Sequence, residues 1–252
     1  MRASMRIGFL ALAFVLLMPG ARADDIVRIA VTSDYPPFNY LDDRGQLAGF
    51  DVDIATALCA AMRASCEFVR VESFVDLIPT LLAGRGDAAV ASMSITEERK
   101  QRVAFTNHYY RTPMQFVGSA GFEWPETEEG LRGRRVAVES GTTAEDYVQN
   151  RLPGSVELLS FPTQDDSIQA LVSGRVDLTL SDTLGMWHFV KSEAGKGFKF
   201  VGSPIYVDEG IGIALRKEDA KLLRQFNLAL ARIRVDGTYD RINARYFPFS
   251  IY

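Results

Sequence analysis

The sequence predicts an α/β protein of two similar lobes, each with a mainly parallel sheet flanked by helices. Two observations lead to this prediction. Strand-like and helix-like segments alternate along the chain, which is typical of parallel sheets covered by helices. In addition, residues 78–92 (IPTLLAGRGDAAVAS) match residues 168–182 (IQALVSGRVDLTLSD) at a constant offset of 90 positions. This echo indicates two units on one plan, although a common βαβ pattern would also produce it.

The first half of the chain contains three expected strands and two expected helices. Apolar spacing predicts strands at 26–31, 66–71 and 87–92 and helices at 51–62 and 73–84. Aspartates at the start of the first helix suit the helix dipole. A serine cap and a glycine stop bound the second helix, and Pro79 argues against a straight one.

The second half repeats this alternation. We expect strands at 134–138, 156–160 and 176–180 and helices at 142–151, 164–174 and 183–192.

The echo also predicts where a ligand would bind. Ser92 lies five residues after Asp87, and Asp182 lies five residues after Asp177, so both follow the carboxyl end of an equivalent strand. Open α/β sheets bind ligands at this end. If the lobes face each other, Asp182 and the hydroxyl-rich loop that carries Arg99 converge on one cleft. A cation and an anion on opposite walls match the zwitterion of an α-amino acid.

Residues 1–23 have the pattern of a cleaved secretory signal peptide. A basic segment (MRASMR) precedes 12 apolar residues and a small-residue cleavage pattern that ends at Ala23. We expect export to an exterior compartment, most simply a bacterial periplasm. Removal of the three arginines in this segment changes the net charge from −4 to −7, which argues against nucleic acid or an anionic membrane as a partner.

The two cysteines, Cys59 and Cys66, lie close together, and an oxidising compartment favours a disulfide between them. We expect a local structural link with no redox role, because no Cys-x-x-Cys spacing is present. We expect no metal site, since His108 and His188 lie far apart without clustered thiols. No cofactor motif is present.

The stretch ASMSITEERKQRVAFT (91–106) has a simpler reading that must be weighed. Ser94 and Glu97 fit a Ser-x-x-Glu capping box, Thr96 is an alternative cap, and Arg99 would then be a surface charge. Likewise, Asp182 would cap the helix that starts at Thr183. These readings compete with ligand binding.

Four longer motifs resemble a known family. YPPFNYLDDRGQLAGFDVDIATALC, SMSITEERKQRVAFT, LRGRRVAVESGTTAEDY and RVDGTYDRINARYF are similar to the periplasmic solute-binding proteins of polar amino acid ABC importers. The nearest types bind lysine/arginine/ornithine, histidine, arginine or glutamine. The resemblance covers nearly the whole chain after residue 23, and the cysteine pair matches the disulfide position of the cationic members.

The family implies a clamshell of two lobes with two hinge crossings. Residues 24–112 and 206–252 would form the first lobe, and residues 113–205 the second. The resemblance also implies a monomer that delivers its ligand to an inner-membrane permease.

The resemblance assigns roles to particular residues. Arg99 would grip the ligand α-carboxylate, helped by Ser94 and by the backbone N–H groups of Ser92 and Thr143. Asp182 would bind the α-ammonium group. Tyr35 and Phe74 would sandwich the ligand side chain between their rings. Both could also be ordinary aromatic residues of the hydrophobic core.

The pattern departs from the family at the side-chain end of the site. Thr32 stands where cationic-ligand members usually carry an acid, although Asp34 is near, and Ala91 and Ala144 replace residues that are often polar. Glu139 stands where the glutamine-binding protein has a lysine. We therefore expect a basic ligand (arginine, lysine, ornithine, histidine or an opine) in preference to glutamine or another polar amino acid.

The main alternative is an enzyme. Periplasmic cyclohexadienyl or arogenate dehydratases resemble these binding proteins and add an acid for proton transfer, a role for which Glu139 or Asp34 is the candidate. We expect no catalytic residue here.

Overall fold

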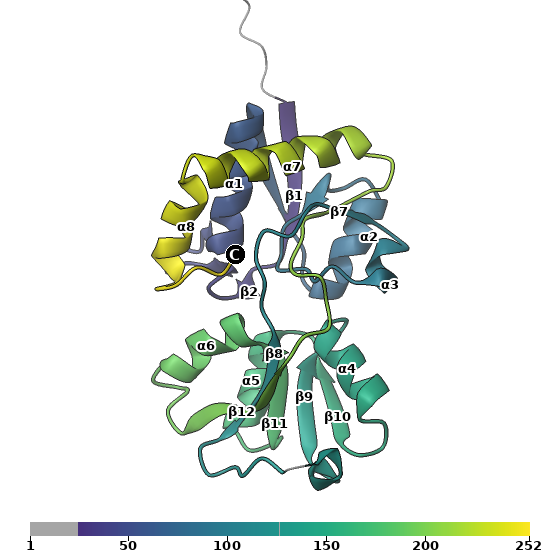
Figure 1. Ribbon diagram of the computed structural model, residues 1–252, viewed down its shortest axis with the longest axis vertical. Helices are drawn as coiled ribbons and strands as arrows, with labels where there is room; N and C mark the ends of the chain where they lie inside the picture. Colours follow the sequence, from purple (N-terminus) through teal and green to yellow (C-terminus); the bar gives the residue numbers. More distant parts are fainter. Residues whose placement is uncertain (1–24, 126) are drawn as a thin grey trace, which may run out of the picture.

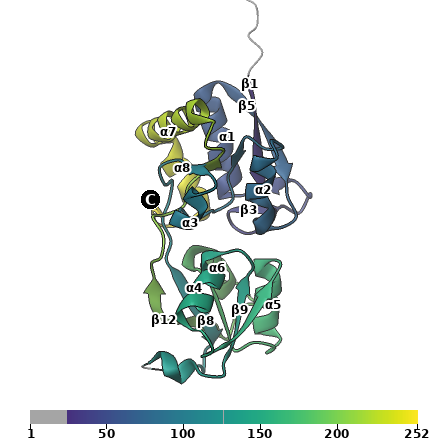
Figure 2. The same ribbon diagram turned by 90° about the vertical axis from the view of Figure 1, so that its right-hand side faces the viewer.

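The computed structural model describes residues 25–125 and 127–252; the predicted signal peptide lies outside them. The chain forms two α/β lobes that lie one above the other and are joined by two chain crossings (Figure 1). The side view shows the same division (Figure 2). The predicted two-lobed α/β fold class is thus confirmed. None of the described helices is long and apolar enough to cross a membrane.

Lobe one contains a five-stranded mixed sheet in the order β5-β1-β6-β13-β7. β1 pairs in parallel with β5 and β6, whereas β13 is antiparallel to β6 and β7. The strands are β1 (Asp25–Val31), β5 (Ala64–Arg70), β6 (Ala88–Ala89), β7 (Ala104–Phe105) and β13 (Ala214–Leu215).

The helices of lobe one cover this sheet. α1 packs against β5 and against α7 and α8, whereas α2 packs against β1 and β6. Their bounds are α1 (Phe50–Met62), α2 (Leu77–Leu82), α3 (Glu97–Lys100), α7 (Ala220–Val235), α8 (Thr238–Tyr246) and the 3-10 helix η1 (Phe74–Asp76). A small antiparallel sheet consists of β2 (Asp34–Tyr35), β3 (Asn39–Leu41) and β4 (Leu47–Ala48).

Lobe two repeats the plan in the order β10-β9-β11-β8-β12. β9 is parallel to β10 and β11, and β8 is antiparallel to β11 and β12. The strands are β8 (Met114–Ser119), β9 (Arg135–Glu139), β10 (Glu157–Phe161), β11 (Leu178–Asp182) and β12 (Phe198–Ile205). The helices are η2 (Glu128–Leu131), α4 (Thr143–Arg151), α5 (Gln164–Val172) and α6 (Thr183–Lys191).

The two crossings run side by side between the lobes. On the lobe-one side, the Ile211 N–H donates to the Tyr110 carbonyl at 2.9 Å, and the Tyr109 N–H donates to the Ile211 carbonyl at 2.9 Å. On the lobe-two side, Met114 of β8 pairs with Ile205 of β12. The predicted boundaries near 112 and 205 fall within these segments, and their positions as boundaries stay a prediction.

The sequence echo corresponds to a repeated ion pair. In lobe one, the Asp87 carboxylate accepts hydrogen bonds from the backbone N–H of Arg28 at 3.0 Å and from its Nη2 at 2.7 Å. In lobe two, Asp177 accepts the same two bonds from Arg135 at 2.8 Å each. Each aspartate directly precedes a strand that pairs in parallel with the arginine's strand. The two equivalent aspartates therefore link neighbouring strands at the same position in each sheet.

Cys59 and Cys66 form a disulfide, as predicted, which joins the last turn of α1 to β5. Among the described residues, no group of three or more histidine, cysteine, aspartate or glutamate side chains is placed to hold a metal ion.

Candidate functional site

A cavity lies between the two lobes, with an empty volume of about 490 Å³ including the part open to solvent. Of the predicted site residues, only Asp34 is not among the residues that line it. We call the residues from each lobe the lobe-one wall and the lobe-two wall. The lobe-one wall is Thr32, Tyr35, Phe74, Ala91, Ser92, Ser94 and Arg99. The lobe-two wall is Met114, Glu139, Thr142, Thr143, Ala144, Gln164, Ser181 and Asp182.

Arg99 lies on α3 and makes hydrogen bonds to both lobes. Thr96 is the N-cap of this helix and accepts the Arg99 backbone N–H at 3.3 Å, so the cap is Thr96 and not Ser94. The guanidinium donates to the Ser94 carbonyl at 2.9 Å and to the Gly141 carbonyl of lobe two at 3.0 Å. Its Cζ stands 5.1 Å from the centre of the Phe74 ring. The guanidinium therefore faces the cavity.

Asp182 ends β11 and occupies the N-cap position of α6, but its side chain makes no capping hydrogen bond. Its Oδ2 instead accepts a hydrogen bond from the Tyr35 hydroxyl of lobe one at 3.3 Å. Burial, followed by the charge of Asp208, raises the pKa of Asp182 to about 7. Its carboxylate is therefore turned to the cavity and away from the helix.

Glu139 ends β9 on the same wall. Burial raises its pKa to about 8, and the charges of Asp34, Asp182 and Asp165 add to this effect. None of the ion pairs found among the described residues includes Glu139, Asp34 or Asp182. The cavity thus contains acidic groups without a paired cation.

The N-terminus of α4 opens on the cavity. Thr142 caps this helix by accepting the Glu145 N–H at 3.4 Å, and its own hydroxyl donates to the Glu139 carbonyl at 2.7 Å. The Thr143 hydroxyl contacts the Met114 sulfur at 3.4 Å. Free N–H groups and the helix dipole make such an end suitable for a carboxylate.

The serines of the lobe-one wall differ in their partners. Ser92 has a positive φ of 51°, and its hydroxyl donates to the buried carboxylate of Asp51 at 2.9 Å. Ser94 offers its carbonyl to Arg99, and no hydrogen bond from its hydroxyl is found among the described residues. The predicted ligand contacts of both serines, and of the Ser92 N–H, stay predictions.

The two aromatic residues are not part of the fully buried core. Tyr35 stands on β2 and stacks on Phe38 with ring centres 5.4 Å apart, and Phe74 starts η1. Both are half-buried and line the cavity. A sandwich around a ligand side chain stays a prediction.

Asp34 also stands on β2, beside Tyr35 but off the cavity wall. Burial raises its pKa, and a hydrogen bond with Thr32 lowers it in part.

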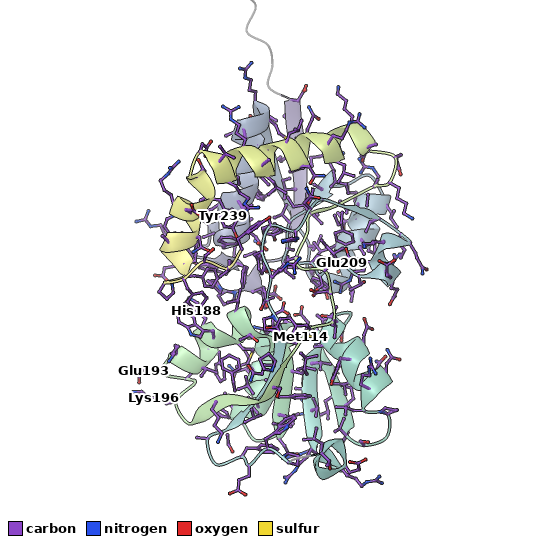
Figure 3. The ribbon with its side chains drawn as sticks, viewed as in Figure 1. Met114, His188, Glu193, Lys196, Glu209 and Tyr239 are labelled. Atoms are coloured by element: carbon purple, nitrogen blue, oxygen red, sulfur yellow. A yellow bond between two sulfur atoms is a disulfide. The ribbon has the colours of Figure 1, made fainter. Side chains whose placement is uncertain are left out.

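Sequence reasoning missed several wall residues. Met114 enters from the first crossing, and Figure 3 shows it at the edge of lobe two that faces lobe one. Gln164 and Ser181 are joined to each other by a hydrogen bond. The position of Ser181, next to Asp182 at a strand end, was a usable signal. No local pattern marks Met114 or Gln164.

Comparison with known proteins agrees with this architecture. The family model for bacterial extracellular solute-binding proteins, family 3, matches residues 27–249. An L-arginine-binding protein of Pseudomonas aeruginosa is 42% identical over 252 residues, which cover 98% of this chain and 96% of that protein. The lysine/arginine/ornithine-binding periplasmic protein of Escherichia coli is 36% identical over 92% of this chain and 91% of its own length.

A solved structure of an ancestral arginine-binding protein bound to arginine has a TM-score of 0.83 at 34% identity, and the match covers 90% of this chain and all of that one. The predicted resemblance is confirmed by these matches. The chain belongs to the bacterial extracellular solute-binding proteins, family 3.

Proposed function

We propose that the protein is the periplasmic substrate-binding component of an amino acid ABC importer and captures a free basic amino acid between its closing lobes. The observation that carries the proposal is that Arg99 and Asp182 line one cavity from opposite walls. Arg99 supplies a planar fork for a carboxylate, and Asp182 supplies an acceptor for an ammonium group. Together they suit the two charged groups that every α-amino acid carries.

The remaining groups of the site support the α-carboxylate end. The N-terminus of α4 lies on the lobe-two wall, where Thr142, Thr143 and Ala144 line the cavity. A charge-assisted hydrogen bond contributes roughly 1.5–3 kcal/mol. Several such bonds account for a micromolar dissociation constant, which needs about 8 kcal/mol.

The acidic groups support a cationic ligand side chain. Glu139 lines the cavity, and its pKa is raised because burial and nearby carboxylates disfavour its charge. A guanidinium or ammonium group would reverse that effect by pairing with it. The names of the relatives point to the same class, because both curated relatives reported above carry arginine in their names. Arginine is therefore the first ligand to test, followed by lysine, ornithine, histidine and opines.

We propose a role in binding without catalysis, since the named relatives are binding proteins. A monomer in the periplasm, released from a signal peptide after Ala23 and docking transiently on a membrane permease, completes the proposal. Mass spectrometry of the exported protein should give Asp24 as its first residue. Size-exclusion chromatography with light scattering should give the mass of one chain.

Isothermal titration calorimetry against the common amino acids and opines tests the central proposal. At least one basic amino acid should bind in the micromolar range or tighter and should raise the unfolding temperature by mass action. The refolded, ligand-free protein is used so that co-purified ligand does not hide binding. If glutamine binds and no basic amino acid does, the basic-ligand assignment is wrong. If no amino acid binds, the proposed function is wrong.

The same preparation tests the enzyme alternative. A carboxyl group with a raised pKa, such as Glu139, is also what a general acid needs. Prephenate and arogenate are therefore incubated with the protein, and their aromatic products are followed by chromatography. We expect none, and turnover that is lost on Glu139→Gln would favour the dehydratase.

A further inference from the structure

Asp51 is a completely buried carboxylate directly behind the lobe-one wall. It stands in the first turn of α1 and does not itself line the cavity. Its Oδ1 accepts a hydrogen bond from the Tyr109 hydroxyl at 2.7 Å. Its Oδ2 accepts one from the Ser92 hydroxyl at 2.9 Å and one from Asn39 Nδ2 at 3.1 Å.

The charge of Asp51 sets the direction of all three bonds. Burial raises its pKa to about 6, and hydrogen bonds from Tyr109, Ser92 and Asn39 limit the rise. Three donors within hydrogen-bond distance of its two oxygens favour the ionised form. An ionised carboxylate accepts hydrogen bonds and has no proton to donate. Each neighbour must therefore turn a proton toward Asp51.

This direction continues through Asn39 to the cavity. Because Nδ2 of Asn39 points to Asp51, its Oδ1 is left for Thr32, whose hydroxyl donates to it at 2.6 Å. Thr32 and Ser92 both line the cavity. A hydroxyl has one proton: that of Ser92 goes to Asp51, and that of Thr32 goes to Asn39 or to the carboxylate of Asp34, whose pKa it lowers. Only oxygen lone pairs remain for a ligand.

We propose that Asp51 is a positioning residue that orients the Thr32 and Ser92 hydroxyls as acceptors, so that the lobe-one wall selects ligand groups that donate hydrogen bonds. The inference rests on the proposed function and deepens it. Guanidinium and ammonium groups are donors without acceptors, whereas an amide or ureido carbonyl needs a donor. A carbonyl placed against this wall would stay unpaired, which is a strong basis for rejection.

Asp51→Asn exchanges hydrogen-bond acceptors for donors on the lobe-one wall without changing the shape of the wall. In this variant one oxygen still accepts from Tyr109, and the amide nitrogen can donate to Ser92 and to a rotated Asn39. The rotated Asn39 then donates to Thr32. Every buried group stays paired, but the Ser92 proton now turns to the cavity, and the Thr32 proton turns to the cavity or to Asp34.

Arginine and citrulline are the probes, because citrulline has the length of arginine with a carbonyl oxygen in place of one terminal NH2 group of the guanidinium. Both are titrated calorimetrically into the wild type and into Asp51→Asn. We expect citrulline to bind about tenfold tighter to the variant and arginine about tenfold weaker, as one hydrogen bond is gained or lost. Loss of negative charge alone would leave citrulline unchanged, and general loosening would weaken both ligands. Either of these results overturns the proposal.

Two further variants provide a control and a second test. Asp53→Asn is the control, because Asp53 lies in the same helical turn but pairs with Arg245 and Tyr246 away from the cavity. It should change neither affinity. Should Asp51→Asn fail to fold, Thr32→Val decides: arginine should bind about tenfold weaker with citrulline unchanged. Unchanged arginine binding there overturns the proposal.

The inference can fail while the proposed function stands. A wild type that binds arginine, with a variant that does not gain citrulline, removes only the role of Asp51. A wild type that binds no basic amino acid removes the basic-ligand assignment and this inference with it.

Discussion

Tyr35 and Asp182 are joined by a hydrogen bond across the cavity, with the phenol oxygen of lobe one 3.3 Å from the carboxylate oxygen of lobe two. The contact links the two lobes through the group that we assign to the ligand ammonium. A cationic N–H donor binds a carboxylate more strongly than a neutral phenol does. A ligand can therefore replace Tyr35 at Asp182.

Asp182→Asn should weaken the binding of every amino acid ligand about 10- to 100-fold, because one charge-assisted bond of roughly 1.5–3 kcal/mol is lost. Calorimetry measures the change. Asp166→Asn is the control, since that exposed aspartate stands in the first turn of α5 outside the cavity lining. Equal affinities of the wild type and Asp182→Asn would contradict the ammonium site.

Arg99→Lys keeps the positive charge but removes the planar fork. The guanidinium donates to carbonyls of both lobes, at Ser94 and Gly141. A lysine cannot make two parallel bonds to a carboxylate, so we expect a loss of about tenfold or more for all amino acids alike. Arg102→Lys, an exposed arginine of the same lobe, should leave affinity unchanged. A loss confined to basic ligands would show that Arg99 does not bind the common carboxylate.

Gly185→Ala should separate lobe closure from fold stability. A Cβ atom at this buried position of α6 would stand 2.5 Å from the Tyr35 hydroxyl oxygen and 2.8 Å from its Cζ. Tyr35 would have to move, or the two lobes would have to stand further apart. Overpacking costs about 1–3 kcal/mol, so affinity should fall roughly 5- to 100-fold.

The thermal midpoint of Gly185→Ala without ligand should not fall together with its affinity, because alanine is favoured over glycine in a helix by about 1 kcal/mol. Gly121→Ala, where nothing lies within 4 Å of the added atom, is the control. Unchanged affinity in Gly185→Ala, measured with the same ligand, would show that closure does not need this glycine.

The raised pKa of Glu139 predicts a pH dependence. Its folded pKa of about 8 lies above its ordinary value of 4.5, so the folded state holds a proton that the unfolded state has released between these pH values. Stability then falls as the pH rises through this window. The ligand-free wild type should lose thermal stability from pH 5 to pH 8, and Glu139→Gln should lose less.

A cationic ligand should reverse this trend by favouring the ionised form of Glu139. Arginine affinity should rise from pH 6 to pH 8, with proton release detectable by calorimetry in buffers of different ionisation enthalpy. Glu139→Gln should release fewer protons. Proton release of the same size in both proteins would assign it to another group, such as Asp182, whose pKa is raised to about 7.

Six of the ten strands in the two sheets were predicted, because strand and helix spacing is a local property, whereas β7, β8, β12 and β13 were not. Two differences in the predicted elements are local. The expected helix at 73–84 divides into η1 and α2, with Pro79 in the first turns of α2. The expected strand at 87–92 shortens to Ala88–Ala89, because the chain turns at Ser92 with its positive φ.

The site was predictable in part. Arg99, Asp182 and the neighbouring hydroxyls follow strand ends, so the sheet rule places each of them at the ligand-binding edge of its own lobe. The proposed role of Asp51 was not visible. An aspartate in the first turn of a helix is ordinarily interpreted as stabilising the helix dipole. Its three buried hydrogen-bond donors, Asn39, Ser92 and Tyr109, are distant in the sequence.

Periodicity, the echo at an offset of 90 residues and four motifs were thus sufficient to predict two α/β lobes, a cysteine link and a cleft with opposite charges. Folding alone determined that Thr96 caps α3, that Tyr35 reaches Asp182 across the lobes, and that Met114 and Gln164 join the wall. The physical reason is distance along the chain. Local spacing governs elements, whereas hydrogen-bond direction and close packing depend on residues that meet only when both lobes have formed.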